Sequence, residues 1–225
     1  MPLDADIFGA GIYTPRQAAR LIGSTPQEVL RWTRGSGATE SLWDAHYQFL
    51  DDTTELSFTD LIELRVVGAF RRAGVSLQAI RFAIELAEKR FSVKHPLSSM
   101  SFKVDGNEIL MEALEKDGEL VSLSKKNPGQ KVFSQIVAQS LSDLEYEDGK
   151  SVRWRPLATP LVVIDPKRLF GAPILDDFGL QTSTIYCEYK QFNDLAYLSA
   201  IYEVPIALLS QAIKFEMALE ESVTG

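Results

Sequence analysis

Two Thr-Pro pairs constrain the fold of this chain more than any other feature. Thr14-Pro15 and Thr25-Pro26 each place a hydroxyl that can accept a backbone N–H before a proline, and proline favours the first position of a helix. The two starts lie eleven residues apart, and Gly23 ends the first helix. This spacing leaves room only for a two-turn helix and a tight turn, so residues 13–32 are expected to form a helix-turn-helix of the DNA-binding kind.

The second helix of this pair carries the residue types that read base edges. Its apolar residues, Val29 and Trp32, share one side, which leaves Gln27, Arg31 and Arg34 outside with Glu28. Arg31 has the geometry for a bidentate pair with guanine, Gln27 for adenine and Arg34 for phosphate. The alternative is a small helical hairpin with a solvated polar face.

Net charge argues against non-specific affinity for nucleic acid but not against a local basic face. The chain carries a net charge of −8 with a pI near 4.9. Residues 36–64 hold seven acids and no base, whereas residues 65–95 hold seven bases and two acids. A DNA-binding face is therefore expected to combine the first helices with residues 65–95.

Compartment follows from the N-terminus and from cysteine usage. The start is acidic and lacks the apolar segment of a signal peptide, and no apolar run approaches the ~20 residues of a membrane span. The single cysteine, Cys187, cannot form an internal disulfide. A cytoplasmic protein is expected.

The N-terminal domain is completed by a wing and two longer helices. Residues 38–57 are interpreted as a loop with short extended pieces, in which a turn at Asp51-Asp52 joins a winged hairpin. A helix over residues 60–73, capped by Ser57 or Thr59, and another beginning at Leu77 follow from their apolar periodicity. The last helix is apolar on more than one side, which fits either burial within the chain or contact with a second copy.

A small mixed connector is expected next. Asp105-Gly106-Asn107 predicts a hairpin of residues 101–104 with 108–111, residues 119–123 a strand, residues 125–129 a loop and residues 132–141 a helix. Asp148-Gly149 predicts a second hairpin of residues 144–147 with 151–155.

The last part is expected to be helical after an apolar run at residues 161–164. Thr182 or Ser183 begins a helix to residue 189, Asn193 caps another to residue 202, and Pro205 opens a third to about residue 221. The resulting fold class is α+β, mainly α. Three domains are expected: residues 1–95 bind DNA, 96–155 are a mixed α/β connector with hairpins, and 156–225 are a helical partner-binding domain.

No catalytic or cofactor-binding constellation is found in the sequence. His46 and His95 have no ligand at metal spacing, and Gly9-Ala10-Gly11 follows no strand and lacks the third glycine of a dinucleotide loop. Cys187 is expected to be a packed thiol. We therefore expect no enzyme, no cofactor and no metal.

At the level of families, residues 12–91 resemble the MerR-type winged helix-turn-helix. The stretch Arg71-Arg72-Ala73-Gly74-Val75-Ser76-Leu77-Gln78-Ala79-Ile80-Arg81 looks like that family's second helical pair. The chain departs from the family in its recognition helix, which carries Leu30, Arg31 and Trp32, so the family's base contacts do not transfer residue by residue. Expected DNA contacts are Thr14, Arg16, Thr25, Gln27, Glu28, Arg31, Arg34, Arg65, Arg71 and Arg72, with Arg81 adding electrostatic attraction.

The whole chain resembles the long VapB-like antitoxins that pair with PIN-domain toxins. Residues 56–67, 164–173 and 201–216 carry this resemblance, the last two as a small C-terminal domain of uncharacterised function. It implies an antitoxin that neutralises a PIN-domain ribonuclease and, as a homodimer, represses its own operon by binding operator DNA. Since PIN nucleases hold Mg²⁺ with carboxylates, an inserted cation can displace the metal, and Arg153, Arg155, Lys167 and Arg168 are the candidates.

Three alternatives remain open. In the first, the four cations serve only solubility at the surface. The chain can instead be a MerR-like transcriptional regulator without a toxin partner, whose C-terminal module senses a ligand or another protein. It can also be an interaction protein that has lost DNA binding.

Overall fold

The computed structural model describes residues 9–37, 39–50, 53–118 and 130–224, and it is mostly helical with one small sheet. The expected α+β, mainly α class is confirmed. Its helices and strands, in chain order, are α1 (Pro15–Ile22), α2 (Pro26–Arg34), α3 (Phe58–Arg72), α4 (Leu77–Phe91), α5 (Met100–Asp117), α7 (Gln130–Leu141), β1 (Leu144–Glu147), β2 (Lys150–Trp154), β3 (Val162–Ile164), the 3₁₀ turn η1 (Leu169–Gly171), β4 (Pro173–Leu175), β5 (Leu180–Gln181), α8 (Thr182–Phe192), α9 (Leu195–Tyr202) and α10 (Ile206–Thr224).

The predicted helical pair is present with its predicted caps. The side chains of Thr14 and Thr25 each accept the backbone N–H of the residue three positions on. The backbone N–H of each threonine donates in turn to the side chain of that residue, which completes a capping box. Gly23 ends α1 with φ of 64°, a left-handed conformation that glycine adopts without steric cost. Ala18, Ala19 and Ile22 of α1 are buried, as are Val29 and Trp32 of α2.

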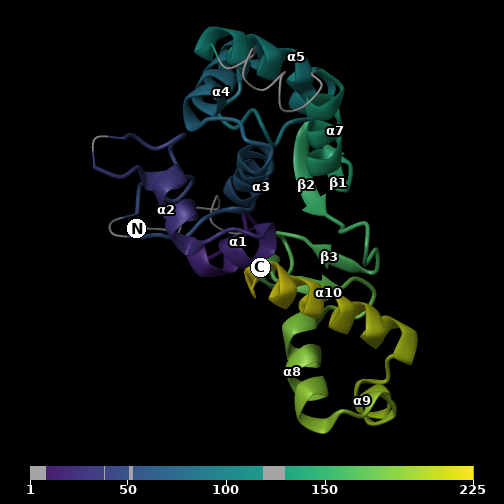
Figure 1. The fold of residues 1–225 in the computed structure, drawn as a ribbon. Coiled ribbons are helices and arrows are strands. Elements are labelled where there is room, and N and C mark those ends of the chain that lie inside the picture. The colour runs from purple at the N-terminus through teal and green to yellow at the C-terminus, as the bar shows by residue number, and fades with distance from the viewer. Residues whose placement is uncertain (1–8, 38, 51–52, 119–129, 225) are drawn as a thin grey trace.

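The helices α3, α4, α5 and α7 form the upper part of the molecule as drawn in Figure 1. The Ser57 side chain caps α3 by accepting the Asp60 backbone N–H, and the Asp60 side chain accepts the Ser57 backbone N–H. Both faces of α3 are buried, and Ala79, Ile80, Ala83, Ile84 and Ala87 of α4 are buried within the same chain. Burial inside one chain therefore accounts for part of the apolar surface of α4. Phe82 and Leu86 are only half-buried, so contact with a second copy stays a prediction.

The hairpin predicted at residues 101–111 is wrong. These residues lie in α5, which Ser99 caps. Phe102, Ile109, Leu110, Ala113 and Leu114 are buried at the three- and four-residue spacing of a helix. Tertiary burial of this face therefore overrides the turn preference of Asp105-Gly106-Asn107.

The winged hairpin predicted at residues 38–57 does not form in the described part of that region. Its main-chain pairing is confined to isolated bridges, Ser36 with Thr39 and Tyr13 with Leu56, and residues 46–49 form a turn. Trp43 and Tyr47 are buried, because this segment folds back on α3 instead of projecting as a wing. The proposed turn at Asp51-Asp52 lies outside the described residues, as do the predicted strand at 119–123 and loop at 125–129.

One antiparallel meander, in the order β1-β2-β3-β4-β5, runs from the upper helices to the C-terminal ones. The hairpin of β1 and β2 around Asp148-Gly149 is confirmed. Both turn residues have positive φ, 49° and 78°, as a tight type I′ hairpin requires. The sheet continues across residues 155 and 156, where the connector and the C-terminal domain were expected to meet.

The helices α8, α9 and α10 project below the sheet in Figure 1, and α10 passes back beside α1. Two expected caps differ. Asp194, not Asn193, caps α9, whereas Asn193 ends α8 in a left-handed conformation. Neither Thr182 nor Ser183 supplies a side-chain cap to α8, and Cys187, expected to be packed, is exposed.

Candidate functional site

The α1–α2 pair presents one exposed polar stripe. Gln27, Arg31 and Arg34 stand at positions i, i+4 and i+7 of α2, and all three are exposed, as is Arg16 on α1. This stripe lies opposite the buried Val29 and Trp32. These four side chains can reach a nucleic acid without breaking a contact that holds the fold.

Three other predicted DNA contacts already serve the helix caps. Thr14 accepts the Gln17 N–H at 3.2 Å, and Thr25 accepts the Glu28 N–H at 3.2 Å. The Ser24 hydroxyl donates to Glu28 at 2.7 Å and, with the Thr25 donors, lowers the pKa of that carboxyl. Glu28 therefore stays charged, and its charge opposes a nearby phosphate.

Arg65 is committed to the core of the molecule. Its two terminal nitrogens donate to both carboxylate oxygens of Asp143, at 2.7 and 3.0 Å, and the guanidinium lies over the ring of Trp154 at 4.3 Å. The Arg65 side chain is only 14% exposed and that of Asp143 7%. This pair joins α3 to the start of β1.

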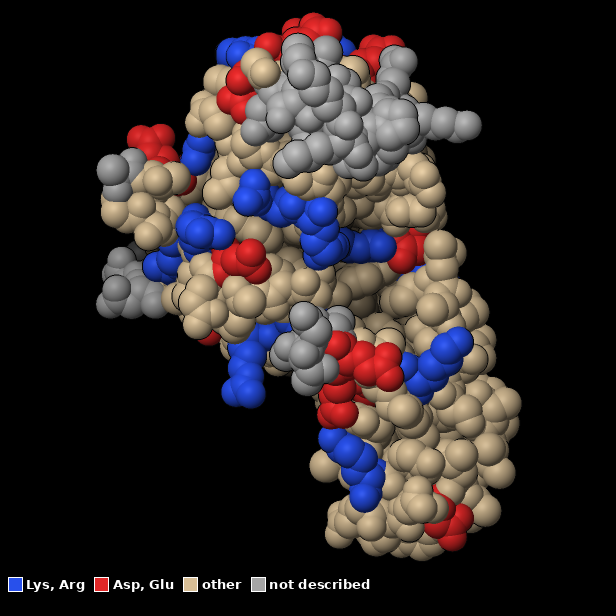
Figure 2. Space-filling model, viewed as in Figure 1, with Lys and Arg blue, Asp and Glu red and all other residues tan. Residues whose placement is uncertain are grey.

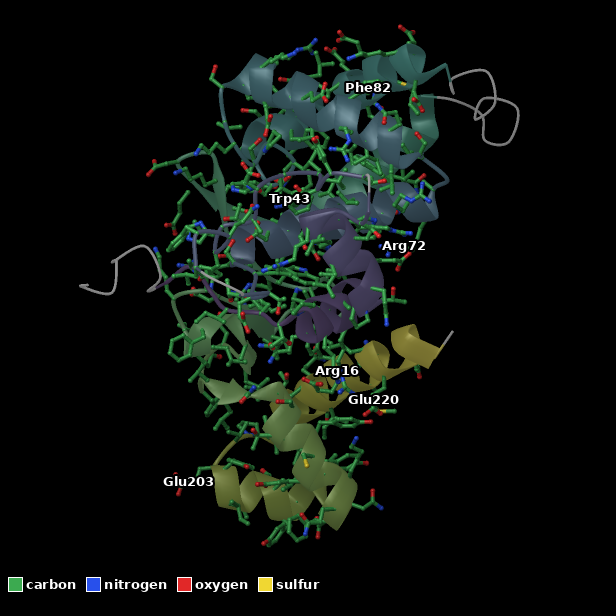
Figure 3. All side chains as sticks on the ribbon, turned by 90° about the vertical axis from the view of Figure 1, so that its left-hand side faces the viewer. Arg16, Trp43, Arg72, Phe82, Glu203 and Glu220 are labelled. Atoms are coloured by element: carbon green, nitrogen blue, oxygen red, sulfur yellow. The ribbon has the colours of Figure 1, made fainter. Side chains whose placement is uncertain are left out.

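Three further arginines of residues 65–95 donate to main-chain carbonyls, while Arg90 pairs with Glu108 and Glu112. Arg71 donates to Val75 at 2.6 Å, Arg72 to Ile22 at 3.2 Å, and Arg81 to Ser41 at 2.7 Å and Glu40 at 2.9 Å. Arg72 thus fastens the end of α3 to the end of α1 (Figure 3). Basic side chains nevertheless gather across the middle of one face in Figure 2, below α4 and α5.

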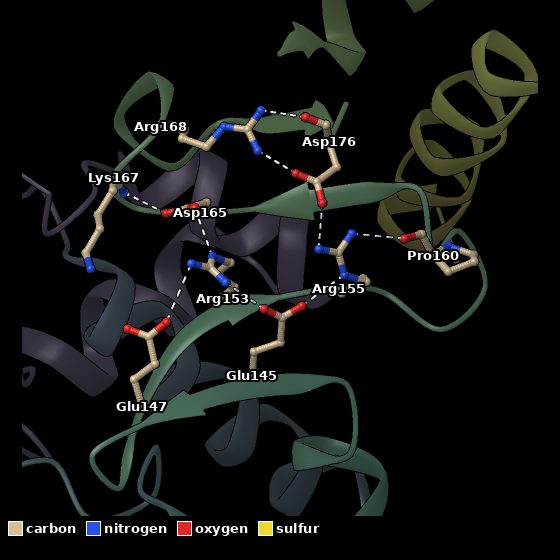
Figure 4. Close-up of polar contacts among 9 residues, drawn as sticks. All are labelled: Glu145, Glu147, Arg153, Arg155, Pro160, Asp165, Lys167, Arg168 and Asp176. Atoms are coloured by element: carbon tan, nitrogen blue, oxygen red, sulfur yellow. Dashed lines mark hydrogen bonds and ion pairs between the residues drawn. The ribbon is translucent and has the colours of Figure 1, made fainter. Parts of the chain in front are cut away.

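The four predicted toxin contacts come together at the sheet, but three of them are paired within the chain (Figure 4). Arg153 contacts Glu145 at 3.0 Å, Glu147 at 3.6 Å and Asp165 at 3.0 Å. These bonds and charges raise the pKa of Arg153. Its charge is therefore already neutralised by carboxylates of its own chain.

Arg155 and Arg168 converge on Asp176. Arg155 reaches Asp176 at 2.7 Å and Glu145 at 3.0 Å, and Arg168 pairs with the same Asp176. The two guanidiniums hold the pKa of Asp176 below its usual range against the opposing effect of burial. Lys167 is exposed, and among the described residues its ammonium has no carboxylate partner.

Three buried carboxylates were not singled out in the sequence. Asp60 accepts from Trp43 at 2.9 Å and from the His46 N–H at 3.1 Å, which anchors residues 43–46 on α3. Glu63 is fully buried, and desolvation raises its pKa to about 8. Glu216 is also buried, on α10. Only Asp60 had a local signal, its place three residues after the cap Ser57.

The two histidines face one open pocket of about 620 Å³, lined also by Trp43, Asp44 and Glu88. The ring atoms His46 Nε2 and His95 Nδ1 have no hydrogen-bond partner there. Burial lowers the pKa of His95. Within the described ranges, no three His, Cys, Asp or Glu side chains stand in a geometry that holds a metal ion.

Across the described residues no single helix is long and apolar enough to cross a membrane. The helices over residues 195–202 and 206–221 are long and apolar enough only when they are taken together, and the chain bends by 112° between them.

The structure is similar to the crystal structure of Rv2018 from Mycobacterium tuberculosis. The TM-score is 0.70 at 22% identity, over 92% of this chain and 98% of that chain. This similarity establishes a shared fold. No family model matches the chain.

A sequence relative is the Mycobacterium tuberculosis protein named "Putative antitoxin VapB45". It is 31% identical over 140 residues, which span 58% of this chain and 58% of that protein. The match thus extends over little more than half the length of the curated relative.

Proposed function

We propose that this chain is the antitoxin of a type II toxin–antitoxin pair, which neutralises a PIN-domain ribonuclease and represses its own operon. The observation that carries the proposal is the 31% identity, over 140 residues, to a protein named as a VapB antitoxin. The capped α1–α2 pair with its exposed polar stripe supports the operator-binding half.

In this proposal DNA is read by the exposed side chains of the first two helices. Arg31 and Gln27 contact bases, while Arg34 and Arg16 contact phosphate. Arg65, Arg71, Arg72 and Arg81 act by holding the helices in place, since each is bonded within the chain. A homodimer would present two such stripes to a repeated operator.

The toxin contact is proposed at the outer end of the sheet. Transfer of Arg153, Arg155 or Arg168 to the carboxylates of a nuclease would break ion pairs that already exist within the chain. Lys167, exposed beside this network, requires no such exchange. We therefore propose that Lys167 is the inserted cation. The three arginines keep their ion pairs within the chain and hold the surrounding sheet in place.

Co-expression with the product of the adjacent gene tests the antitoxin half. A stable complex and loss of the partner's ribonuclease activity are expected. Lys167→Glu should weaken the complex, whereas Lys89→Glu, an exposed lysine of α4, should not. Absence of both complex and neutralisation would overturn the antitoxin assignment and favour a MerR-like regulator without a toxin partner.

A further inference from the structure

A pocket of about 500 Å³ opens where the helix pair, the sheet and the last helix meet. The end of α1, the end of α3, the loop after β2 and the second half of α10 each contribute to it. Figure 2 shows the face hollowed below the row of basic side chains, where these elements meet. Its lining residues are Leu21, Ile22, Gly23, Arg72, Trp154, Pro156, Ala158, Thr159, Lys214, Phe215, Ala218 and Leu219.

The floor of this pocket is apolar. Leu21 and Ile22 of α1 face Phe215 and Leu219 of α10 across it, with Trp154 of β2 at one side. Its volume lies within the roughly 300–1,000 Å³ of small-molecule sites. An apolar body of modest size can therefore displace water from it at a gain of about 25 cal/mol per Å² of apolar surface buried.

Two cations stand at this pocket, and among the described residues no carboxylate lines it. Arg72 uses Nη1 for the Ile22 carbonyl at 3.2 Å, and Lys214 donates to the Ala158 carbonyl at 3.3 Å. Within the described part of the chain neither makes an ion pair. Burial and, to a lesser extent, the neighbouring Arg65 lower the pKa of Arg72, while Glu28 opposes this shift.

One buried polar group in the wall also has no partner among the residues that the structure describes. Thr159 is 2% exposed, and its hydroxyl makes no hydrogen bond to any of them. The main-chain groups of Thr159 are satisfied, by Pro156 at 3.0 Å and Val162 at 2.9 Å, so only the side chain is left without a bond. A buried hydroxyl without a partner is unfavourable, and a hydrogen bond to a ligand oxygen can recover that cost.

We propose that this pocket binds a small organic anion with an apolar body, of the monocarboxylate class. The carboxylate lies between Arg72 and Lys214, and the apolar chain rests against the side chains of α1 and α10. The Thr159 hydroxyl donates a hydrogen bond to the ligand. This site is independent of toxin and operator binding, and it gives α1 and α10 a shared ligand.

Binding is measured on the full chain by calorimetry with three ten-carbon probes that differ only in the head group. Decanoate is expected to bind at one site, at least about tenfold more tightly than decanol or decyltrimethylammonium. Its affinity should fall as salt rises, since Lys214 is exposed. Equal affinity for decanol, or no decanoate binding below its solubility limit, overturns the proposal.

Variants locate the site. Ala158→Phe, in the exposed loop, fills the pocket and should abolish decanoate binding. Ser210→Phe, which fills the neighbouring groove between α8 and α10, should leave it unchanged. The reverse pattern places the ligand in that groove and refutes the assignment.

The head-group contacts are tested by conservative changes. Lys214→Gln on the surface of α10 should weaken decanoate binding about threefold or more, and Thr159→Val about fivefold. Lys89→Gln on α4 is the matched control for removal of one exposed positive charge. If Lys214→Gln and Lys89→Gln behave alike, the anion is not held at this mouth.

Discussion

Arg20 of α1 donates to Glu216 of α10 across 2.6 Å, joining residues 196 positions apart. Glu216 is 1% exposed and also accepts from the Thr182 hydroxyl of α8. One buried carboxylate thus fastens the first helix of the helix-turn-helix to two helices of the C-terminal part.

Replacement of this carboxylate is expected to loosen that junction. Glu216→Ala leaves Arg20 without its acceptor and Thr182 with only the Pro173 carbonyl at 3.3 Å, and it should lower the free energy of unfolding by about 2–3 kcal/mol. Denaturant unfolding measures the change. Lys190→Gln, which breaks a Lys190–Glu220 pair exposed by 53% and 48%, should leave the free energy of unfolding nearly unchanged. Equal costs would show that Glu216 does not couple the two parts.

Stability is expected to fall as pH rises from 5 to 8 because of Glu63. Burial raises the pKa of Glu63 to about 8 from its ordinary 4.5, so between these values the folded chain holds a proton that the unfolded chain has released. The slope contributed by this group is up to about −1.4 kcal/mol per pH unit.

The substitution Glu63→Gln tests this linkage, since an amide oxygen can still accept the Ser98 N–H that Glu63 binds at 2.6 Å. Thermal unfolding at several pH values should show a flatter profile for Glu63→Gln. The exposed Glu108→Gln should retain the slope of the unmodified chain. If stability falls with pH as steeply in Glu63→Gln as in the unmodified chain, the pH dependence comes from a group other than Glu63.

Arg31→Ala is expected to weaken operator binding by about 1–3 kcal/mol, the usual worth of a bidentate base contact. Arg34→Ala should weaken specific and non-specific binding alike and reduce the salt dependence by about one ion. Gel-shift titrations at several salt concentrations measure both effects, with Lys89→Ala as the control. Unaltered binding in Arg31→Ala would exclude α2 as the reading helix.

Arg65→Ala is expected to affect stability and not DNA affinity. Its removal leaves the nearly buried Asp143 without its ion-pair partner and uncovers the ring of Trp154. The free energy of unfolding should fall by about 3 kcal/mol. At temperatures where the variant stays folded, operator affinity should match that of the unmodified chain. A loss of affinity without a loss of stability would return Arg65 to the DNA-binding surface.

Two Asp-Gly pairs show how far local sequence predicts this fold. Asp148-Gly149 forms the predicted tight turn, and its neighbours pair as β1 and β2. Asp105-Gly106 lies inside α5, where a Cβ on Gly106 would lie only 2.8 Å from the ring of Phe102. The same dipeptide serves a turn in one place and close packing in the other, and only tertiary contacts distinguish them.

The site divides in the same way. The capping boxes of α1 and α2 were predictable because donor and acceptor lie three residues apart. The pairing of Arg65 with Asp143 spans 78 residues and has no local signal. Sequence therefore identified which basic residues are candidates but could not separate those that face solvent from those bonded within the fold.

The arginine network also bears on the middle of the sheet. In the described strands β2 and β3 share one register pair, Trp154 with Ile164, so the main-chain ladder is thin at this point. Arg153 reaches Asp165 after β3, and Arg155 reaches Asp176 after β4. At this point of the sheet, side-chain ion pairs connect neighbouring strands that backbone hydrogen bonds connect elsewhere. Ionic strength should thus set how stiffly the C-terminal helices are held against the rest, a mechanical adjustment that needs no change of fold.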